Sequence, residues 1–122
     1  MLPKLSQGVT TVVVGNCGIS ASPVSLDGEV PDPMNLLGRA EDFRYPTFAA
    51  YAEAVTTARP GVNVAALIGH TSLRSQVMDR FDRSASPAEI ATMRAQLETA
   101  LAEGALGLSS GQIGRASCRE RV

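Results

Sequence analysis

The chain has 122 residues, of which 44% are hydrophobic and 19% charged, and its net charge is −1 at pH 7. This composition is ordinary for a globular domain, and the balanced charge excludes a basic surface for nucleic acid or for membranes. No apolar run reaches the length of a membrane span, and two distant cysteines, Cys17 and Cys118, do not make a disulfide framework. We therefore expect a cytoplasmic α/β protein that binds neither nucleic acid nor a membrane.

The first predicted strand covers residues 9–15 (VTTVVVG), which begin with six β-branched residues and show no polar alternation. Such a run is typical of a strand buried on both faces, as in a parallel sheet covered by helices. The sequence Gly15-Asn16-Cys17-Gly18 then ends the strand abruptly. Ligands of α/β folds bind at the carboxyl ends of the strands, so Asn16 and Cys17 are candidate site residues.

Two further strands are predicted over residues 62–68 (VNVAALI) and 105–109 (ALGLS). A helical pattern lies between each pair of consecutive strands, so the element order is β-α-β-α-β. This alternation implies a parallel sheet with right-handed crossovers.

The first predicted helix covers about residues 47–58, with Thr47 as its N-cap, and stops at Pro60-Gly61. The second begins at Ser86-Pro87-Ala88-Glu89, which combines an N-cap serine, a proline at the first helical position and a glutamate three residues after the cap. Apolar residues follow at helical spacing until Gly104 closes the helix.

Two connecting segments carry no regular pattern. Residues 19–46 are rich in proline and glycine, and a loop of this length is typically functional or mobile. We expect it to lie over the same face of the sheet as Cys17. Residues 72–86 carry charges of alternating sign, which favours a solvated loop.

Each predicted strand delivers polar residues at its carboxyl end: Cys17 after the first, His70 after the second, and Ser109 and Ser110 at the third. This coincidence suggests the rim of an active site. Each position also has an ordinary structural interpretation, as a buried thiol, a hydrogen-bonded structural histidine, or the serines that end a strand.

Two chemistries remain open for Cys17. It could be a nucleophile, with His70 as base and Asn16 as orienting group. It could instead be a thiolate metal ligand, but a zinc site needs three or four protein ligands. The strand ends offer one cysteine and one histidine, so this chain does not complete such a site alone.

The segments LSQGVTTVVVGNCGISASP, NLLGRAEDFRYPTFAAYAEAV, NVAALIGHTSLR and ALAEGALGLSSG resemble, in the same order, the N-acyl-D-amino-acid deacylases. These are zinc enzymes of the amidohydrolase superfamily. The resemblance implies a slice of a (β/α)8 barrel that comprises strands two to four. It also implies zinc-assisted hydrolysis of a small-molecule substrate, the amide of an N-acyl-D-amino acid.

By the same resemblance, Cys17 matches a metal ligand of the family. His70 matches a family position near the site. Asn16, Ser109 and Ser110, from their places at the strand ends, would with His70 line the active site or bind substrate. The other ligands (a His-x-His upstream and two histidines downstream) and the catalytic aspartate are expected outside this sequence.

The resemblance divides the chain into a partial barrel, residues 1–111, and a tail, residues 112–122. The tail, QIGRASCRERV, can be back-translated to a string containing AGATCGGAAGAGC, which looks like a sequencing adapter. We expect the tail to be non-native and Cys118 to carry no function. We also expect the fragment to be inactive alone, and its unpaired sheet edges to favour aggregation.

Three other functions remain possible on the sequence alone. The parent enzyme could be a hydantoinase-like cyclic-amide hydrolase, or a cysteine-nucleophile hydrolase that uses Cys17 and His70. The third is a small non-catalytic α/β domain, which would fold stably alone.

Overall fold

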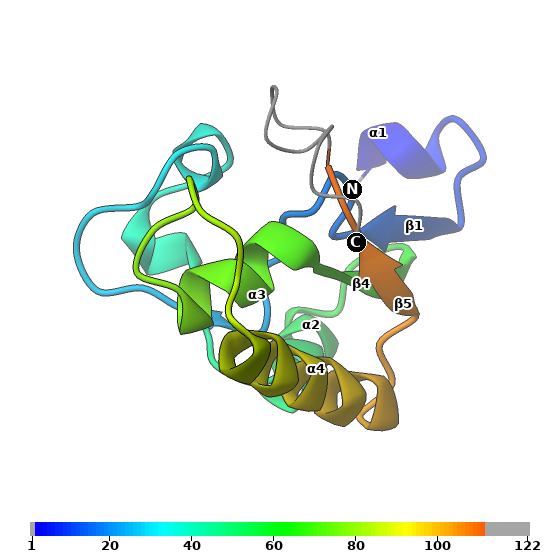
Figure 1. The fold of residues 1–122 in the computed structure, drawn as a ribbon. Helices are drawn as coiled ribbons and strands as arrows, with labels where there is room; N and C mark the ends of the chain where they lie inside the picture. Colours follow the sequence, from blue (N-terminus) through cyan, green and yellow to red (C-terminus); the bar gives the residue numbers. More distant parts are fainter. Residues whose placement is uncertain (1, 112–122) are drawn as a thin grey trace.

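The computed structural model describes residues 2–111, so the predicted tail and Cys118 lie outside the described residues. A three-stranded parallel sheet is formed by β1 (Thr11–Val14), β4 (Asn63–Gly69) and β5 (Gly107–Ser109), in the order β1-β4-β5 (Figure 1). The register places Val14 beside Ala66 and Ile68 beside Leu108. The three predicted strands and their parallel arrangement are confirmed, with somewhat different ends.

The helices are α1 (Leu2–Leu5), α2 (Phe48–Ala58), α3 (His70–Val77) and α4 (Pro87–Ala102). The predicted caps of α2 and α4 are confirmed. Thr47 Oγ1 accepts a hydrogen bond from the Ala50 N–H at 3.1 Å. Ser86 and Glu89 form a reciprocal capping box, with distances of 3.3 and 2.7 Å. Within residues 2–111, no helix is long and apolar enough to cross a membrane.

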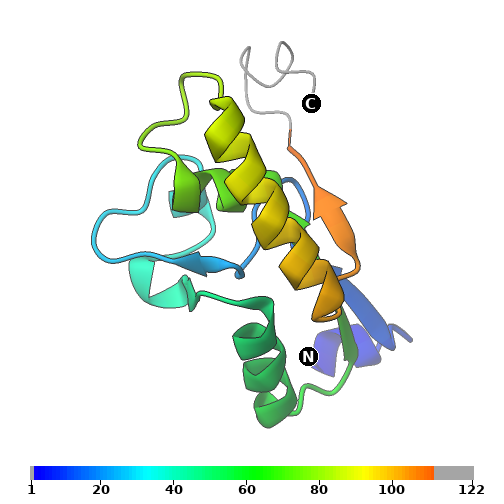
Figure 2. The ribbon, with the colours of Figure 1, turned by 60° about the horizontal axis from the view of Figure 1, so that its bottom comes forward.

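The main core lies between β4 and the three longer helices. Ala66 and Ile68 share one face of β4, because alternate residues of a strand point to the same side. They pack in one cluster with Phe48 of α2, Leu73 of α3 and Met93 of α4. Figures 1 and 2 show α2 and α4 against the same side of the sheet. The helices therefore cover one face of the three strands.

The prediction that the first strand is buried on both faces is wrong for this chain. Val13 of β1 is 46% exposed, and Thr11 is also exposed. Within the described residues β1 pairs with β4 alone, and the core helices cover only the face that carries Val14. The β-branched run thus forms an edge strand with one open face.

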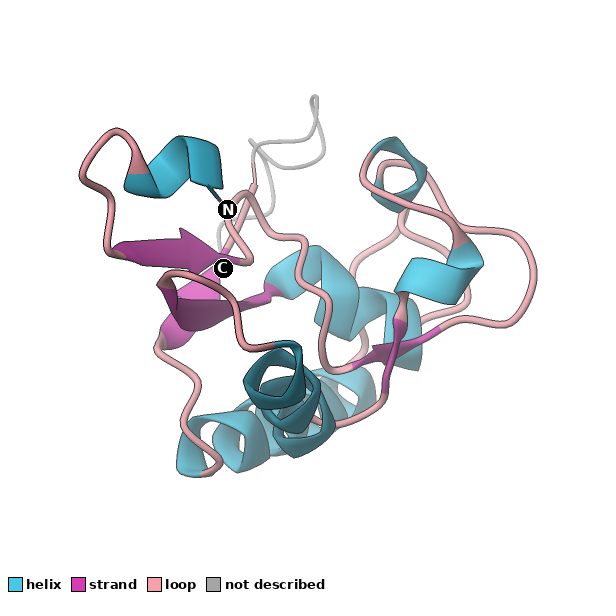
Figure 3. Ribbon diagram, turned by 180° about the vertical axis from the view of Figure 1, so that it is seen from behind, coloured by secondary structure: helices cyan, strands magenta, loops and turns pink. Residues whose placement is uncertain are grey.

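Residues 19–46 form a packed unit with short regular elements of its own. They contain β2 (Val24–Ser25) antiparallel to β3 (Arg44–Tyr45), and two short 3-10 helices, η1 (Met34–Leu36) and η2 (Ala40–Asp42). Val24, Met34 and Phe43 are buried in a second small core. The Ser25 N–H donates to Gln76 Oε1 at 3.1 Å, and Figure 3 shows the two-stranded ribbon beside α3.

The prediction of a solvated loop over residues 72–86 is wrong for its first half, which belongs to α3. Leu73 packs in the main core, and Arg74 is only 7% exposed although it is charged. The Arg74 guanidinium donates to the carbonyls of Phe81 and Arg83 at 3.0 and 2.8 Å. These carbonyls replace water as hydrogen-bond partners, which allows the cationic head to be buried.

Candidate functional site

The structure brings the three strand ends together, as the sequence predicted. The turn after β1 contacts the carboxyl ends of both other strands, directly at β5 and through the start of α3 after β4. The Gly18 carbonyl accepts a hydrogen bond from the Thr71 N–H, at the start of α3, at 2.8 Å. The Gly18 N–H donates to Ser109 Oγ, at the end of β5, at 3.2 Å. Cys17 therefore lies on a turn that is held by the ends of both other strands.

The turn has an unusual backbone conformation. Gly15, Cys17 and Gly18 all have positive φ angles, of 81°, 58° and 80°. This conformation is uncommon for a residue with a side chain, and it persists where the surroundings impose it. A Cβ atom on Gly111 would lie 2.2 Å from the Cys17 carbonyl oxygen. The chain after β5 thus approaches the Cys17 backbone as closely as glycine allows.

Cys17 itself carries a free thiol, and the residue is exposed at the carboxyl edge of the sheet. Its neighbour Asn16 is also exposed, and the Asn16 side-chain amide donates to the Val13 carbonyl at 2.8 Å. This bond ties the turn back to β1. The interpretation of Cys17 as a buried structural thiol does not hold within the described chain.

A pair of buried serines fixes the chain as it leaves the turn. Ser72 Oγ accepts from the Ser20 N–H at 2.8 Å and donates to the Ser20 carbonyl at 3.0 Å. Ser20 Oγ accepts from the Gly69 N–H at 2.9 Å and donates to the Ser22 carbonyl at 2.6 Å. Neither serine was predicted as a site residue. Ser20 follows the turn and Ser72 lies in α3, 52 positions later, and no local pattern in the sequence indicates that they pair.

The other predicted site residues lie along the same edge. His70 is the first residue of α3 and is partly buried. Ser110 follows β5 and is exposed, whereas Ser109 is partly buried. The Ser109 hydroxyl donates to the Gly15 carbonyl and accepts from the Gly18 N–H. Ser109 is therefore engaged with the turn that carries Cys17.

The exposed thiol fits the donor chemistry of a single zinc ligand. Among residues 2–111, no group of three or more histidine, cysteine, aspartate or glutamate side chains is arranged to hold a metal ion. A zinc site requires three or four protein ligands. Cys17 can therefore contribute one ligand, and the described residues do not complete the site.

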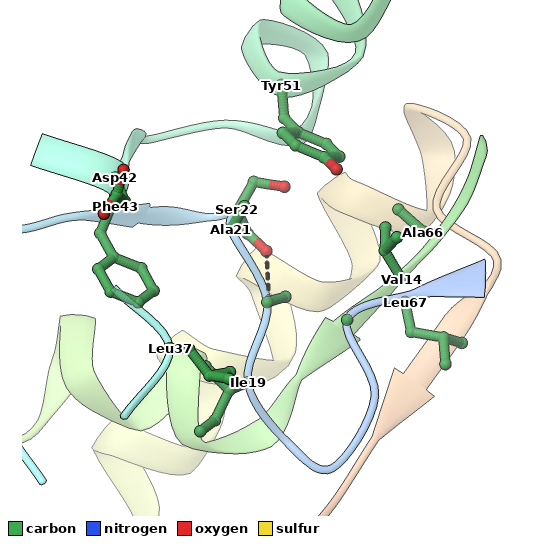
Figure 4. A pocket seen from close by; sticks show the side chains of 12 residues that line it. Val14, Ile19, Ala21, Ser22, Leu37, Asp42, Phe43, Tyr51, Ala66 and Leu67 are labelled. Atoms are coloured by element: carbon green, nitrogen blue, oxygen red, sulfur yellow. Dashed lines mark hydrogen bonds between the residues drawn. The ribbon is translucent and has the colours of Figure 1, made fainter. Parts of the chain in front are cut away.

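A pocket of about 210 Å³ lies beside the turn (Figure 4). Val14, Ala66, Phe43 and Tyr51 line it, together with the start of the segment after the turn. Burial raises the pKa of the Tyr51 hydroxyl. Neither Cys17 nor His70 belongs to this lining. The pocket adjoins the candidate site, because Gly15 of the turn and Ser20 belong to its lining.

Comparison with known sequences identifies relatives that are longer than this chain. It is 52% identical to the N-acyl-D-aspartate deacylase of Alcaligenes xylosoxydans xylosoxydans over 111 residues, which are 91% of this chain and 22% of that protein. It is 46% identical to a D-aminoacylase of the same organism, over 91% of this chain and 23% of that protein. No family model matches the chain. The chain spans about a fifth of the length of these curated relatives.

Two solved structures share this arrangement of elements. One is a D-aminoacylase, determined to define the role of its binuclear metal centre, with a TM-score of 0.85 and 45% identity over 95% of this chain and 24% of that one. The other is N-acyl-D-glutamate deacylase from Bordetella bronchiseptica, with zinc and a phosphonate mimic of the tetrahedral intermediate. Its TM-score is 0.78, with 44% identity over 88% of this chain and 22% of that one. These relationships confirm the resemblance predicted from the sequence.

Proposed function

We propose that this chain, which is homologous to one segment of the N-acyl-D-amino-acid deacylases, forms part of a zinc-dependent amidohydrolase. The reaction is hydrolysis of the amide of an N-acyl-D-amino acid, which yields a carboxylate and a free D-amino acid. The observation that carries this proposal is the 52% identity over 111 residues. An aligned length of 111 in 122 residues necessarily includes the Cys17 turn and the ends of β4 and β5.

Three features support a slice of a (β/α)8 barrel over residues 1–111. The strands are parallel and follow each other in chain order, β1-β4-β5. The core helices pack on one face, as the outer ring of a barrel does. The polar residues gather at the carboxyl ends of the strands, where barrel enzymes place their active sites. In a closed barrel the open face of β1, with Val13, would be covered by the opposite strands.

Within this enzyme, Cys17 provides one thiolate ligand of the metal site. Zinc, when bound, polarises the acyl carbonyl and lowers the pKa of a bound water. The remaining ligands and the catalytic aspartate lie outside residues 2–111. The turn conformation and the exposure of Cys17 at the strand ends support this assignment, because they leave the thiol accessible at the edge where the ligands would meet.

The neighbouring polar residues line the same site. Asn16 fixes the turn through its bond to the Val13 carbonyl. His70 and Ser110 directly follow β4 and β5 at this edge, and in this proposal they line the substrate region. Residues 112–122 are a non-native tail in this proposal, and the enzyme is cytoplasmic.

The test uses the full-length protein, meaning the complete reading frame that carries this segment, purified with zinc. We expect release of free D-amino acid from N-acetyl-D-aspartate, N-acetyl-D-glutamate or a neutral N-acetyl-D-amino acid, and no release from the L-enantiomers. Chelation should abolish the activity and added zinc should restore it. Cys17→Ala should lose both zinc and activity.

Other outcomes point to the alternatives. Activity that survives thorough chelation but disappears in Cys17→Ala indicates a cysteine nucleophile. Hydrolysis of hydantoins without hydrolysis of N-acyl-D-amino acids indicates a cyclic-amide hydrolase. A stable, monomeric and inactive protein of 122 residues with no extension of its reading frame indicates a non-catalytic domain.

A further inference from the structure

We propose that Ser109 is a positioning residue for the metal-ligand thiol, because its hydroxyl closes the turn that carries Cys17. This inference rests on the proposed function, in which Cys17 holds the metal. It differs from the role expected from the sequence, where Ser109 lines the site or binds substrate.

The hydroxyl joins the two ends of the turn. Ser109 Oγ donates to the carbonyl of Gly15, the first residue of the turn, and accepts at 3.2 Å from the N–H of Gly18, the last residue. In an ordinary β-turn, the carbonyl of the first residue and the N–H of the fourth bond directly to each other. Here a side chain from β5 stands between them. The turn is therefore closed by a residue of another strand.

This closure is needed because the conformation of Cys17 is disfavoured by itself. Its φ of 58° is in the left-handed region, which persists in a non-glycine residue where surrounding contacts fix it. The Thr71 N–H holds the Gly18 carbonyl at 2.8 Å, and Asn16 holds the strand side of the turn. The Ser109 hydroxyl is the described contact that binds both ends of the turn.

The hydrogen-bonding capacity of Ser109 also argues against a donor role toward substrate. A serine hydroxyl has a single O–H to donate, and Ser109 donates it to the Gly15 carbonyl. The exposed hydroxyl of Ser110 has no such engagement among the described contacts. Within this pair, Ser109 serves the turn, and Ser110 is the one placed to meet a ligand.

The expected effect is on metal affinity. Removing the hydroxyl leaves the Gly15 carbonyl and the buried Gly18 N–H without this partner, so the turn is no longer held in one conformation. Partners that orient a metal ligand typically contribute 10- to 100-fold to metal affinity. We expect Ser109→Ala to weaken zinc binding by about 10- to 100-fold.

The experiment measures zinc affinity of the full-length protein by competition with a chromophoric chelator. The key comparison is Ser109→Thr against Ser109→Val, which have the same shape and differ in the hydroxyl. We expect Ser109→Thr to bind zinc nearly as the wild type does, and Ser109→Val to be as weak as Ser109→Ala. Ser84→Ala removes an exposed hydroxyl and should leave affinity unchanged. Met93→Ala lowers stability in the core, away from the turn, and should also leave affinity unchanged.

A second readout is the thiolate-to-metal charge-transfer absorption of the cobalt-substituted protein. We expect this band to shift or weaken in Ser109→Ala and in Ser109→Val, and to be retained in Ser109→Thr. A general loss of stability does not produce this pattern.

The outcomes separate the two proposals. If Cys17→Ala retains full zinc affinity, the assignment of Cys17 as a ligand, and with it the proposed function, fails. If Cys17→Ala loses zinc while Ser109→Ala and Ser109→Val bind it as the wild type does, the positioning role alone is overturned. It is also overturned if Ser109→Thr is as weak as Ser109→Val, or if Met93→Ala weakens zinc binding as much as Ser109→Ala does.

Discussion

The carboxyl edge of the sheet and the helical layer beside it are held by different interactions. At the carboxyl edge, comprising the turn of residues 15–18 with Ser20, Ser72 and Ser109, hydroxyls bridge backbone groups at defined distances. In the helical layer, apolar side chains such as Ile68, which is 0% exposed, pack between β4 and the helices. Hydrogen bonds are directional, whereas apolar burial depends mainly on area. The edge should therefore tolerate much less change than the layer.

The largest effect is expected from Gly15→Ala. A Cβ at this position would lie 2.2 Å from the Leu67 carbonyl oxygen, and the φ of 81° is unfavourable for alanine. Together these should lower the free energy of unfolding by about 2–5 kcal/mol. Gly8→Ala is the matched control, because Gly8 has the same φ of 81° but no atom within 4 Å of the added Cβ.

Urea denaturation of the full-length protein would measure both variants. Both variants pay the cost of a left-handed backbone, because Gly15 and Gly8 have the same φ. The difference between their losses in the free energy of unfolding therefore measures the close approach to Leu67 alone. Equal losses of unfolding free energy in Gly15→Ala and Gly8→Ala would show that the edge can adjust to the added Cβ. They would contradict the claim that the edge tolerates less change than the helical layer.

The next largest effect is expected from Ser72→Ala. This change leaves the buried N–H and carbonyl of Ser20 without their partner, which should cost about 1–3 kcal/mol. Hydrogen exchange at the amides of Ser20 and Gly69 would report the loss locally. Ser84→Ala, at an exposed position, should leave the same amides protected as before. Unchanged exchange in Ser72→Ala would argue against the serine pair as an anchor.

A smaller effect is expected from Ile68→Val in the helical layer. Removing one buried methylene should cost about 0.5–1.5 kcal/mol, because the neighbouring side chains can partly relax into the space. Urea midpoints of Ile68→Val and Ser72→Ala, compared directly, would rank the two regions. A larger loss in Ile68→Val than in Ser72→Ala would reverse the ranking.

The smallest effect is a pH dependence at the start of α4. The hydrogen bond from Arg83 and the Ser86 backbone lower the pKa of Glu89 from 4.5 to about 2. A lowered pKa in the folded state means that the contribution to stability is complete above pH 4.5 and is lost as the pH falls toward about 2. Unfolding midpoints between these pH values should fall less steeply in Glu89→Gln than in the wild type.

Asp79 provides an internal reference for that measurement, because its pKa is also lowered by Arg83 and it remains in Glu89→Gln. Some pH dependence should therefore persist in the variant. Identical slopes in the variant and the wild type would contradict the assignment to Glu89.

Local patterns in the sequence were enough to predict the strands of the sheet and the helices α2 and α4. The capping box at Ser86 and Glu89 and the apolar runs of β1 and β4 depend on residues close together in the chain. The position of Cys17 at a strand end followed from the same patterns.

The remaining features depend on contacts between distant residues. Val13 is exposed because no described strand or helix covers its face of β1. The β-branched residues of β1 do not themselves determine which elements cover the strand. Arg74 is buried because its guanidinium donates to the carbonyls of Phe81 and Arg83. Its charge, taken by itself, predicts exposure to solvent. The Ser20–Ser72 pair spans 52 positions, and no local pattern indicates which serine bonds to which.

The hydroxyl that closes the Cys17 turn also has a consequence for timing. Ser109 is 91 positions after Gly18, and a chain is synthesised from its N-terminus onward. The turn therefore emerges long before the strand that completes it. Until β5 pairs with β4, the thiol is present without its final geometry. In the proposed enzyme, docking of β5 is therefore one condition for productive capture of the metal ion, beside the arrival of the ligands that lie outside residues 2–111.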